Sequence, residues 1–164
     1  MNRRLAVGLA GLLLMGAGVA GAEALEGRFR LAYDSADEPC LPYRLYAVDL
    51  TRQAPERGEL AVFDGATVTA RFGAAPSFTK QVAGLPGDRV RVTAEGAWVN
   101  ENFIGPLSQA VLERAGLRVS DLVGEWVVPA GQMFVVGTEP RAFDSRYYGM
   151  VPLDAITGIA RPLW

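Results

Sequence analysis

One lysine and one cysteine are the side chains of this 164-residue sequence best suited to covalent chemistry. Lys80 is the sole lysine among sixteen cationic side chains, Cys40 is the sole cysteine, and there is no histidine. Without histidine, a Ser-His-Asp or Cys-His arrangement and any histidine-based metal site are excluded. A nucleophile in this chain therefore needs another base, and lysine is the usual substitute where burial disfavours its charge.

Lys80 precedes Val82 and a Gly-Leu-Pro-Gly-Asp turn at 84–88. In a strand, Lys80 and Val82 point to the same face, so a core-facing Val82 implies an inward Lys80. An inward lysine is costly unless it is neutral or partnered, and a neutral lysine is a general base. Periodicity alone favours the simpler interpretation, a surface lysine whose stem covers an apolar edge.

Cys40 stands two residues before Pro42, in the stretch Glu-Pro-Cys-Leu-Pro. The residue before a proline is held extended, which suits a side chain presented from the end of a strand. With one cysteine, an intramolecular disulfide and a cysteine-rich zinc site are both excluded. The thiol is either a reactive group or a buried, inert one, the commonest state of a lone cysteine.

A third polar group lies near the C-terminus, where Asp144, Ser145 and Arg146 stand between apolar segments. Such density favours a hydrogen-bonded site, and composition alone leaves a plain polar turn open. The net charge of −2 gives no basic surface that would indicate nucleic-acid binding.

The N-terminus carries Arg3 and Arg4, then eighteen uncharged residues from Leu5 to Ala22. The small residues at 20–22 fit a leader cleavage site, and the run is also long enough to anchor the chain in a bilayer. We therefore divide the chain into a signal peptide or membrane anchor at 1–24 and a domain at 25–164. The positive-inside rule places that domain outside the cytoplasm.

The rest of the sequence predicts short strands. Residues 27–33, 66–72 and 88–93 alternate as half-buried strands do, and 45–50, 59–63, 125–129 and 132–137 are short apolar runs between turn residues. The spacing of apolar residues over 106–116 predicts one helix, which Gly116 can end. We expect a β-rich domain with one helical insertion.

Four stretches in this order resemble the signal peptidase I family, and in particular its conjugative TraF-type branch, the pilin-maturation peptidases. Cys40-Leu41-Pro42 stands where the family has a serine shortly before a proline, and Gly58 to Phe63 is similar to its Gly-Asp strand. The general-base motif is matched in full by Lys80, Val82, Gly84, Pro86, Gly87 and Asp88. The terminal motif is matched by Asp144, Ser145, Arg146, Tyr147, Gly149, Val151, Pro152, Ile156, Gly158 and Ala160.

The resemblance implies a mainly β, signal peptidase/LexA-like catalytic domain behind an N-terminal hydrophobic helix. It implies a Ser/Lys-type endopeptidase facing the periplasm at the inner membrane, without metal or cofactor. The substrate would be a pro-pilin or another exported precursor, bound beside Leu41 and Pro42. Asp144 corresponds to an acidic residue of the TraF-type site, and in signal peptidases the serine at the place of Ser145 helps to orient the lysine.

The departure from the family is Cys40, because a serine is expected at the nucleophile position. A thiol is more acidic than a hydroxyl and is already a good nucleophile, so a Cys40–Lys80 pair is chemically sound. Ser35 is a poorer candidate, because its distance from Pro42 does not fit the motif. Two other hypotheses stay open: an inactive assembly or scaffold factor of a conjugative pilus, and a general leader peptidase.

Overall fold

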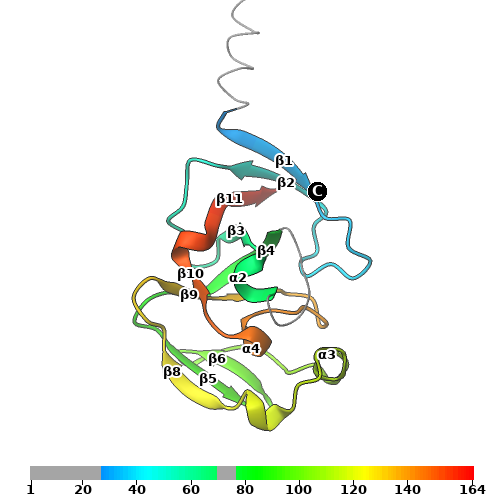
Figure 1. Ribbon diagram of the computed structural model, residues 1–164, viewed down its shortest axis with the longest axis vertical. Helices are drawn as coiled ribbons and strands as arrows, with labels where there is room; N and C mark the ends of the chain where they lie inside the picture. Colours follow the sequence, from blue (N-terminus) through cyan, green and yellow to red (C-terminus); the bar gives the residue numbers. More distant parts are fainter. Residues whose placement is uncertain (1–26, 70–76) are drawn as a thin grey trace, which may run out of the picture.

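The computed structural model describes residues 27–69 and 77–164, which form two antiparallel sheets joined end to end (Figure 1). The seven-stranded sheet has the order β1-β2-β11-β3-β4-β9-β10 and the four-stranded sheet the order β7-β6-β5-β8. The first contains β1 (Phe29–Tyr33), β2 (Leu45–Asp49), β3 (Leu60–Asp64), β4 (Ser77–Gly84), β9 (Gln132–Val136), β10 (Val151–Pro152) and β11 (Ile156–Pro162). The second contains β5 (Arg89–Thr93), β6 (Gly96–Val99), β7 (Asn102–Gly105) and β8 (Gly124–Val127).

The mainly β architecture predicted from the sequence is confirmed. In β5, Val90 and Val92 are buried while Arg89 and Arg91 are exposed, as the alternation of 88–93 predicted. The expected N-terminal helix, and with it the segment 1–24, lies outside the described residues. Within residues 27–69 and 77–164, no helix has the length and apolar content needed to cross a membrane.

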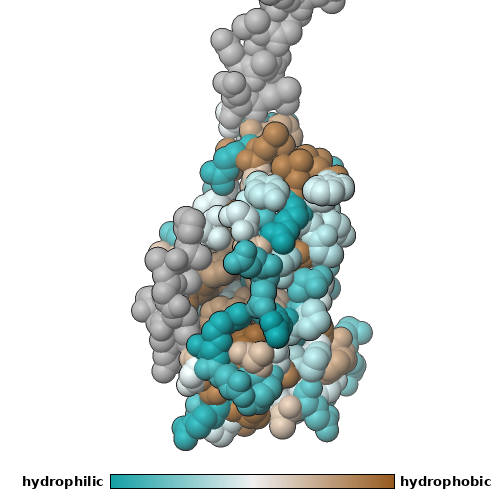
Figure 2. Space-filling view, turned by 90° about the vertical axis from the view of Figure 1, so that its right-hand side faces the viewer, coloured by the Kyte–Doolittle hydropathy of each residue, from teal (hydrophilic) through white to brown (hydrophobic). Residues whose placement is uncertain are grey.

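The sequence predicted a half-buried strand over 27–33. The strand is present as β1, but the prediction was wrong about burial, because its apolar face is exposed. β1 is the outermost strand and pairs with β2 alone, so one of its edges and much of its surface stay open. Leu31 and Tyr33 are 69% and 67% exposed. Leu163 and Trp164 are also exposed, next to Leu45 of β2, and this end of the molecule carries apolar surface (Figure 2).

The prediction of a strand over 66–72 was also wrong, since α2 (Ala66–Thr69) is a single helical turn. The side chain of Asp64 accepts the N–H of Ala66, and the Thr67 hydroxyl donates to the Asp64 carbonyl. These local hydrogen bonds favour a turn over continued strand pairing. Residues 70–76 of that prediction lie outside the described part of the chain.

The helix predicted over 106–116 is present as α3 (Gln109–Ala115), and Gly116 ends it in the left-handed conformation at φ 63°. Further single turns are α4 (Ser145–Tyr148), η1 (Val119–Asp121) and η2 (Leu153–Ala155). α4 lies in the terminal polar motif and was not predicted as a helix, because four residues carry no helical periodicity.

The turn at 84–88 connects the two sheets, because β4 ends at Gly84 and β5 begins at Arg89. Asp88 donates its N–H to the Leu85 carbonyl, Pro86 is the first central residue, and Gly87 has φ +91°, as a type II turn requires. The carboxylate of Asp88 also accepts the Leu85 N–H and pairs with Arg57. The motif residues Gly84 to Asp88 are therefore a structural joint.

Candidate active site

Lys80 is 1% exposed in the middle of β4, with Val82 buried two residues away on the same face. This confirms that the lysine points inward and excludes the simpler surface interpretation. On the β3 side its partner in the register is Ala61, whose small side chain leaves room for the lysine stem. The Lys80 Nζ lies 5.3 Å from the centre of the Phe78 ring.

No carboxylate of the described residues lies within ion-pair distance of Lys80. An ammonium group buried without a counter-ion is costly. A buried amine at this position is placed to act as a base toward a neighbouring nucleophile.

The register of β4 and β9 brings Cys40 to the lysine. Gln81 pairs with Val136 and Val82 with Val135, so the next step of the antiparallel ladder puts Lys80 opposite Gly137. A Cβ built on Gly137 would lie 3.1 Å from the Cys40 Cβ and 2.6 Å from its carbonyl oxygen. Directly opposed residues project side chains from the same face. Cys40 thus packs over the sheet beside Lys80, on the face that carries the lysine.

Cys40 is partly exposed, and few contacts hold its segment. Its carbonyl accepts the Glu139 N–H at 3.2 Å. On one side Leu41 is buried in a small core, and on the other Glu38 pairs with Arg114 of α3 and with Arg141. Of the two residues expected to bind substrate, Leu41 therefore has its side chain in the core, while Pro42 is exposed.

Ser35 is exposed in the loop after β1, where Arg44 donates to the carbonyls of its neighbours Asp34 and Ala36. These hydrogen bonds tie the loop to Arg44, and they give no support to Ser35 as a nucleophile.

Asp144 is fully buried, and both of its oxygens are occupied. Oδ1 accepts the Arg146 Nε–H at 2.9 Å and the Arg146 backbone N–H, and Oδ2 accepts from Arg146 Nη2 at 2.7 Å and from the Gly137 N–H at 2.8 Å. The bond to Gly137 fixes the backbone on which Cys40 packs. Among the described residues, the Asp144 carboxylate accepts from Gly137 and Arg146 and makes no hydrogen bond with Lys80 or Cys40, so its place is that of a positioning residue.

Arg146 connects the two sheets, because its Nη1 donates to the Pro106 carbonyl at 2.7 Å, just beyond β7. Next to it, the Tyr147 hydroxyl accepts the Ser108 N–H at 2.8 Å. Gly149 ends this turn at φ +86°, a conformation that favours glycine. The Asp-Ser-Arg-Tyr motif is thus a buried clamp between the sheets, and the hydrogen-bonded interpretation of this stretch is confirmed.

Ser145 is buried, and its Oγ accepts the Val135 N–H at 3.0 Å. Val135 is the register partner of Val82, so the hydroxyl lies near the strand that carries Lys80. Its described contact is with the β9 backbone.

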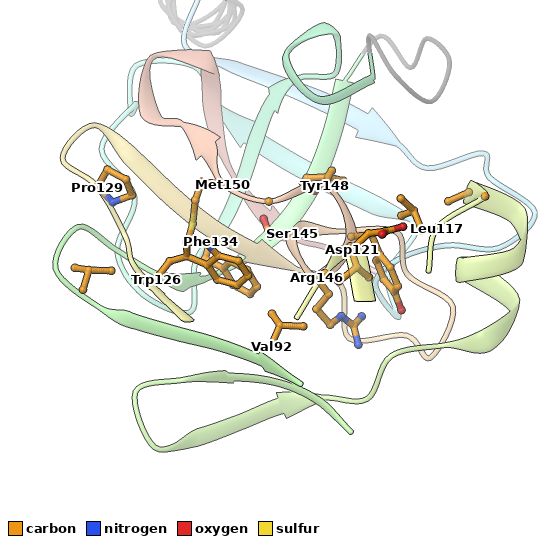
Figure 3. A pocket seen from close by; sticks show the side chains of 16 residues that line it. Val92, Leu117, Asp121, Trp126, Pro129, Phe134, Ser145, Arg146, Tyr148 and Met150 are labelled. Carbon is orange, nitrogen blue, oxygen red and sulfur yellow. The ribbon is translucent and has the colours of Figure 1, made fainter. Parts of the chain in front are cut away.

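A cavity of about 630 Å³ lies behind α4, between this segment and the four-stranded sheet (Figure 3). Ser145 and Tyr148 line it together with apolar side chains that include Phe134, Trp126 and Met150. Neither Cys40 nor Lys80 is among its lining residues. The cavity is thus separate from the proposed reaction centre, although the two share the α4 segment.

The chain thus combines a mainly antiparallel β fold with a buried lysine that lies on the face of the sheet where Cys40 packs. Residues 9–164 match the model of the signal peptidase family, peptidase S26, and the chain belongs to this family. The family resemblance drawn from the motifs is thereby confirmed.

Three relatives show how far the similarity extends. The chain is 29% identical over 172 residues to the conjugal transfer protein TraF of Agrobacterium fabrum, covering 96% of this chain and 93% of that protein. It is 32% identical over 112 residues to the probable signal peptidase I-2 of Synechocystis sp., covering 65% of this chain and 46% of that protein. A solved signal peptidase I from Enterococcus faecalis aligns with a TM-score of 0.40 and 24% identity, over 65% of this chain and 96% of that one. The chain spans about half the length of the signal peptidase I relatives that it matches.

Sequence reasoning missed three residues of this region. Gly137 is required because a side chain there would meet Cys40 and Ala142. Glu38 was seen only as a neighbour of the cysteine, and its arginine partners are distant in sequence. Tyr148 is not among the matched motif residues, and only the structure shows that its hydroxyl is buried.

Proposed function

We propose that this protein is an endopeptidase that cleaves exported precursors with Cys40 as nucleophile and Lys80 as base. Membership of the signal peptidase family supports peptidase action on exported precursors. The observation that carries the dyad is the burial of Lys80, the sole lysine, with no counter-ion among the described residues. It lies opposite Gly137, on which the sole cysteine packs.

In the proposed reaction, Lys80 takes the proton of Cys40, and the resulting ammonium and thiolate stabilise each other. The thiolate attacks the scissile carbonyl carbon, whose π electrons move to oxygen. The tetrahedral adduct collapses, the C–N bond breaks, and the leaving amine takes the proton from Lys80. Water, or an amine of the substrate itself, then attacks the thioester and regenerates the thiol.

The substrate we propose is a pro-pilin. The motif resemblance to TraF-type peptidases supports this, as does the similarity over nearly the full length to a protein named for conjugal transfer. A general leader peptidase predicts instead that unrelated exported precursors are cleaved as efficiently.

We also propose that the domain works on the periplasmic face of the inner membrane. The apolar run at 5–22 and the positive residues before it support this orientation. The exposed apolar residues Leu31, Tyr33, Leu163 and Trp164 give the end near β1 a surface suited to a membrane interface. Fractionation of cells into periplasm, membrane and cytoplasm tests the proposal, and recovery in the cytoplasm contradicts it.

The central experiment is processing of a co-expressed pro-pilin, followed by mass spectrometry of the product. Cys40→Ala and Lys80→Ala are expected to abolish processing, Cys40→Ser to retain part of it, and Ser35→Ala, the matched control, to process normally. The mass also distinguishes a cleaved product from a cyclised one, which is lighter by one water. Unimpaired processing by Cys40→Ala would remove Cys40 as the nucleophile. Normal processing by Lys80→Ala as well would favour the non-catalytic assembly factor.

A further inference from the structure

The cavity behind α4 has the dimensions of a binding site for a small organic molecule. Its volume of about 630 Å³ lies within the roughly 300–1,000 Å³ of such sites and well above the roughly 150 Å³ of a cavity that holds benzene. Two of its lining residues on β8, Trp126 and Val127, are 45% and 60% exposed, so the cavity opens to solvent beside this strand.

Trp126 forms an aromatic wall at the mouth of the cavity. Its ring lies over Gly124 of the same strand, because a Cβ built on that glycine would lie 2.6 Å from the indole. β8 pairs with β5 alone, so no further strand covers the ring. A large aromatic surface that is fixed and half-exposed at the mouth of an apolar space is suited to stacking against another planar ring.

The two sides of the cavity differ in polarity (Figure 3). Trp126, Phe134 and Met150 form an apolar side, and the flexible methionine can adapt to the shape of an occupant. Arg146 and Asp121 lie on the other side. The lining therefore matches a molecule with an aromatic body and one polar end.

The polar side offers hydrogen-bond donors but little net charge. Arg146 is neutralised by Asp144, and Asp121 is neutralised by Arg118. The described hydrogen bonds use three of the five guanidinium N–H groups of Arg146, two to Asp144 and one to the Pro106 carbonyl. A further acceptor can use the remaining two. The polar end of the occupant is therefore best an uncharged acceptor such as a carbonyl oxygen.

We propose that the cavity binds an uncharged, planar aromatic molecule whose ring stacks on Trp126 and whose carbonyl oxygen accepts a hydrogen bond from Arg146. A concave space of this kind suits a small molecule, whereas a protein partner needs a wide surface of about 800 Å² on each side. The proposal concerns binding alone and does not depend on the peptidase reaction.

An occupant also stabilises the turn beside the proposed reaction centre. Residues 145–149 all line the cavity, so the occupant packs against α4 and the glycine that ends it. Asp144, which immediately precedes them, accepts the Gly137 N–H at 2.8 Å, and Cys40 packs on Gly137. Opening of α4 dismantles this wall of the cavity. Binding therefore favours the closed turn and the backbone position that it fixes.

Prodan, an uncharged naphthalene with a ketone at one end, is a suitable probe, because its emission shifts to the blue in an apolar site. Trp126→Ala should weaken its binding to the full chain about tenfold. Trp98→Ala is the matched control and should bind as wild type does, since Trp98 lies on the same sheet against Arg91 and does not line the cavity. Comparing the two variants cancels binding to the apolar N-terminal run. The analogue 2-dimethylaminonaphthalene lacks the ketone and should bind several-fold more weakly.

Hydrogen exchange followed by NMR tests the effect on α4. With prodan at about 100 times its Kd, exchange of the Gly137 amide should slow about 100-fold. The Leu50 amide, bonded to the Arg28 carbonyl beside β1 and β2, is the control and should be unaffected. Equal affinity in wild type and Trp126→Ala, or unchanged Gly137 exchange, overturns the proposal. A wild-type protein that meets both expectations but cleaves no precursor keeps this site and contradicts the peptidase.

Discussion

Lys80 and Cys40 are held by different kinds of structure. Lys80 lies inside β4, which is paired with β3 on one side and β9 on the other, so backbone hydrogen bonds fix its position. Cys40 lies in an irregular segment that depends on packing against Gly137 and on ion pairs of Glu38. The proposed base therefore lies in the core of the sheet, while the proposed nucleophile lies at its edge.

This difference explains where the family pattern is kept and where it changes. A change at Lys80 would alter a buried position between two strands, whereas exchanging one small nucleophilic side chain for another at a loop position disturbs no pairing. The base motif is matched in full, and the departure is at Cys40. Substitutions at these two positions, and at the residues that hold them, test this contrast.

The largest effect is expected at Lys80. Lys80→Met should lower the cleavage rate by about 10²–10⁴-fold, the usual contribution of a general base. Its melting temperature should not fall, because an apolar side chain of similar length replaces a buried amine without a counter-ion. Lys80→Arg is the control, since it keeps the charge but cannot act as a base. A Met variant that melts lower and still cleaves would show that the lysine is structural.

The next largest effect concerns the clamp between the sheets. Asp144→Asn leaves the Arg146 guanidinium buried without its counter-ion, so we expect the free energy of unfolding to fall by about 3–5 kcal/mol. Chemical denaturation measures this change. Asp121→Asn breaks the exposed pair with Arg118 and should have little effect. Equal stability of the two variants would contradict the clamp.

A smaller effect is expected at Gly137. In Gly137→Ala the new methyl group would lie 2.6 Å from the Cys40 carbonyl oxygen and would also meet Ala142. Such overpacking costs about 1–3 kcal/mol and should displace the nucleophile, so the cleavage rate should fall more than stability alone explains. Gly27→Ala is the control, because nothing lies within 4 Å of an added Cβ there. A Gly137→Ala variant with a normal cleavage rate would show that the position of Cys40 does not depend on its packing against Gly137.

The smallest effect is expected at Glu38, which is exposed. Its hydrogen bond with Arg141, together with Arg114, holds the pKa of Glu38 below its ordinary value of 4.5. Its contribution is therefore fully present above pH 4.5 and is lost as the pH falls through the lowered value. Glu38→Gln should reduce the rate a few-fold near neutral pH, and the two rates should converge in acid. A rate difference that is constant with pH would exclude the ion pairs as the cause.

The sequence predicted the buried position of Lys80 better than the edges of the fold. Lys80 could be recognised because a lone lysine, a strand alternation and a complete motif agree at one position. The contact between Cys40 and Gly137 could not be predicted, because it depends on the β4–β9 register across a long sequence separation. β1 was misjudged because alternation shows which residues share a face but not that another element covers it.

The α4 turn also makes the two sheets depend on each other for stability. The Asp144 carboxylate accepts the N–H of Gly137, the residue that follows β9. Three residues later, the Tyr147 hydroxyl accepts the N–H of Ser108, the residue that precedes α3. These two amides lie in different parts of the domain, one just after β9 and the other at the start of α3, yet opening this one turn would release both. We therefore expect them to exchange with solvent deuterium at matched rates, as members of one cooperative unit. The segment beside the proposed reaction centre would then open together with the start of α3.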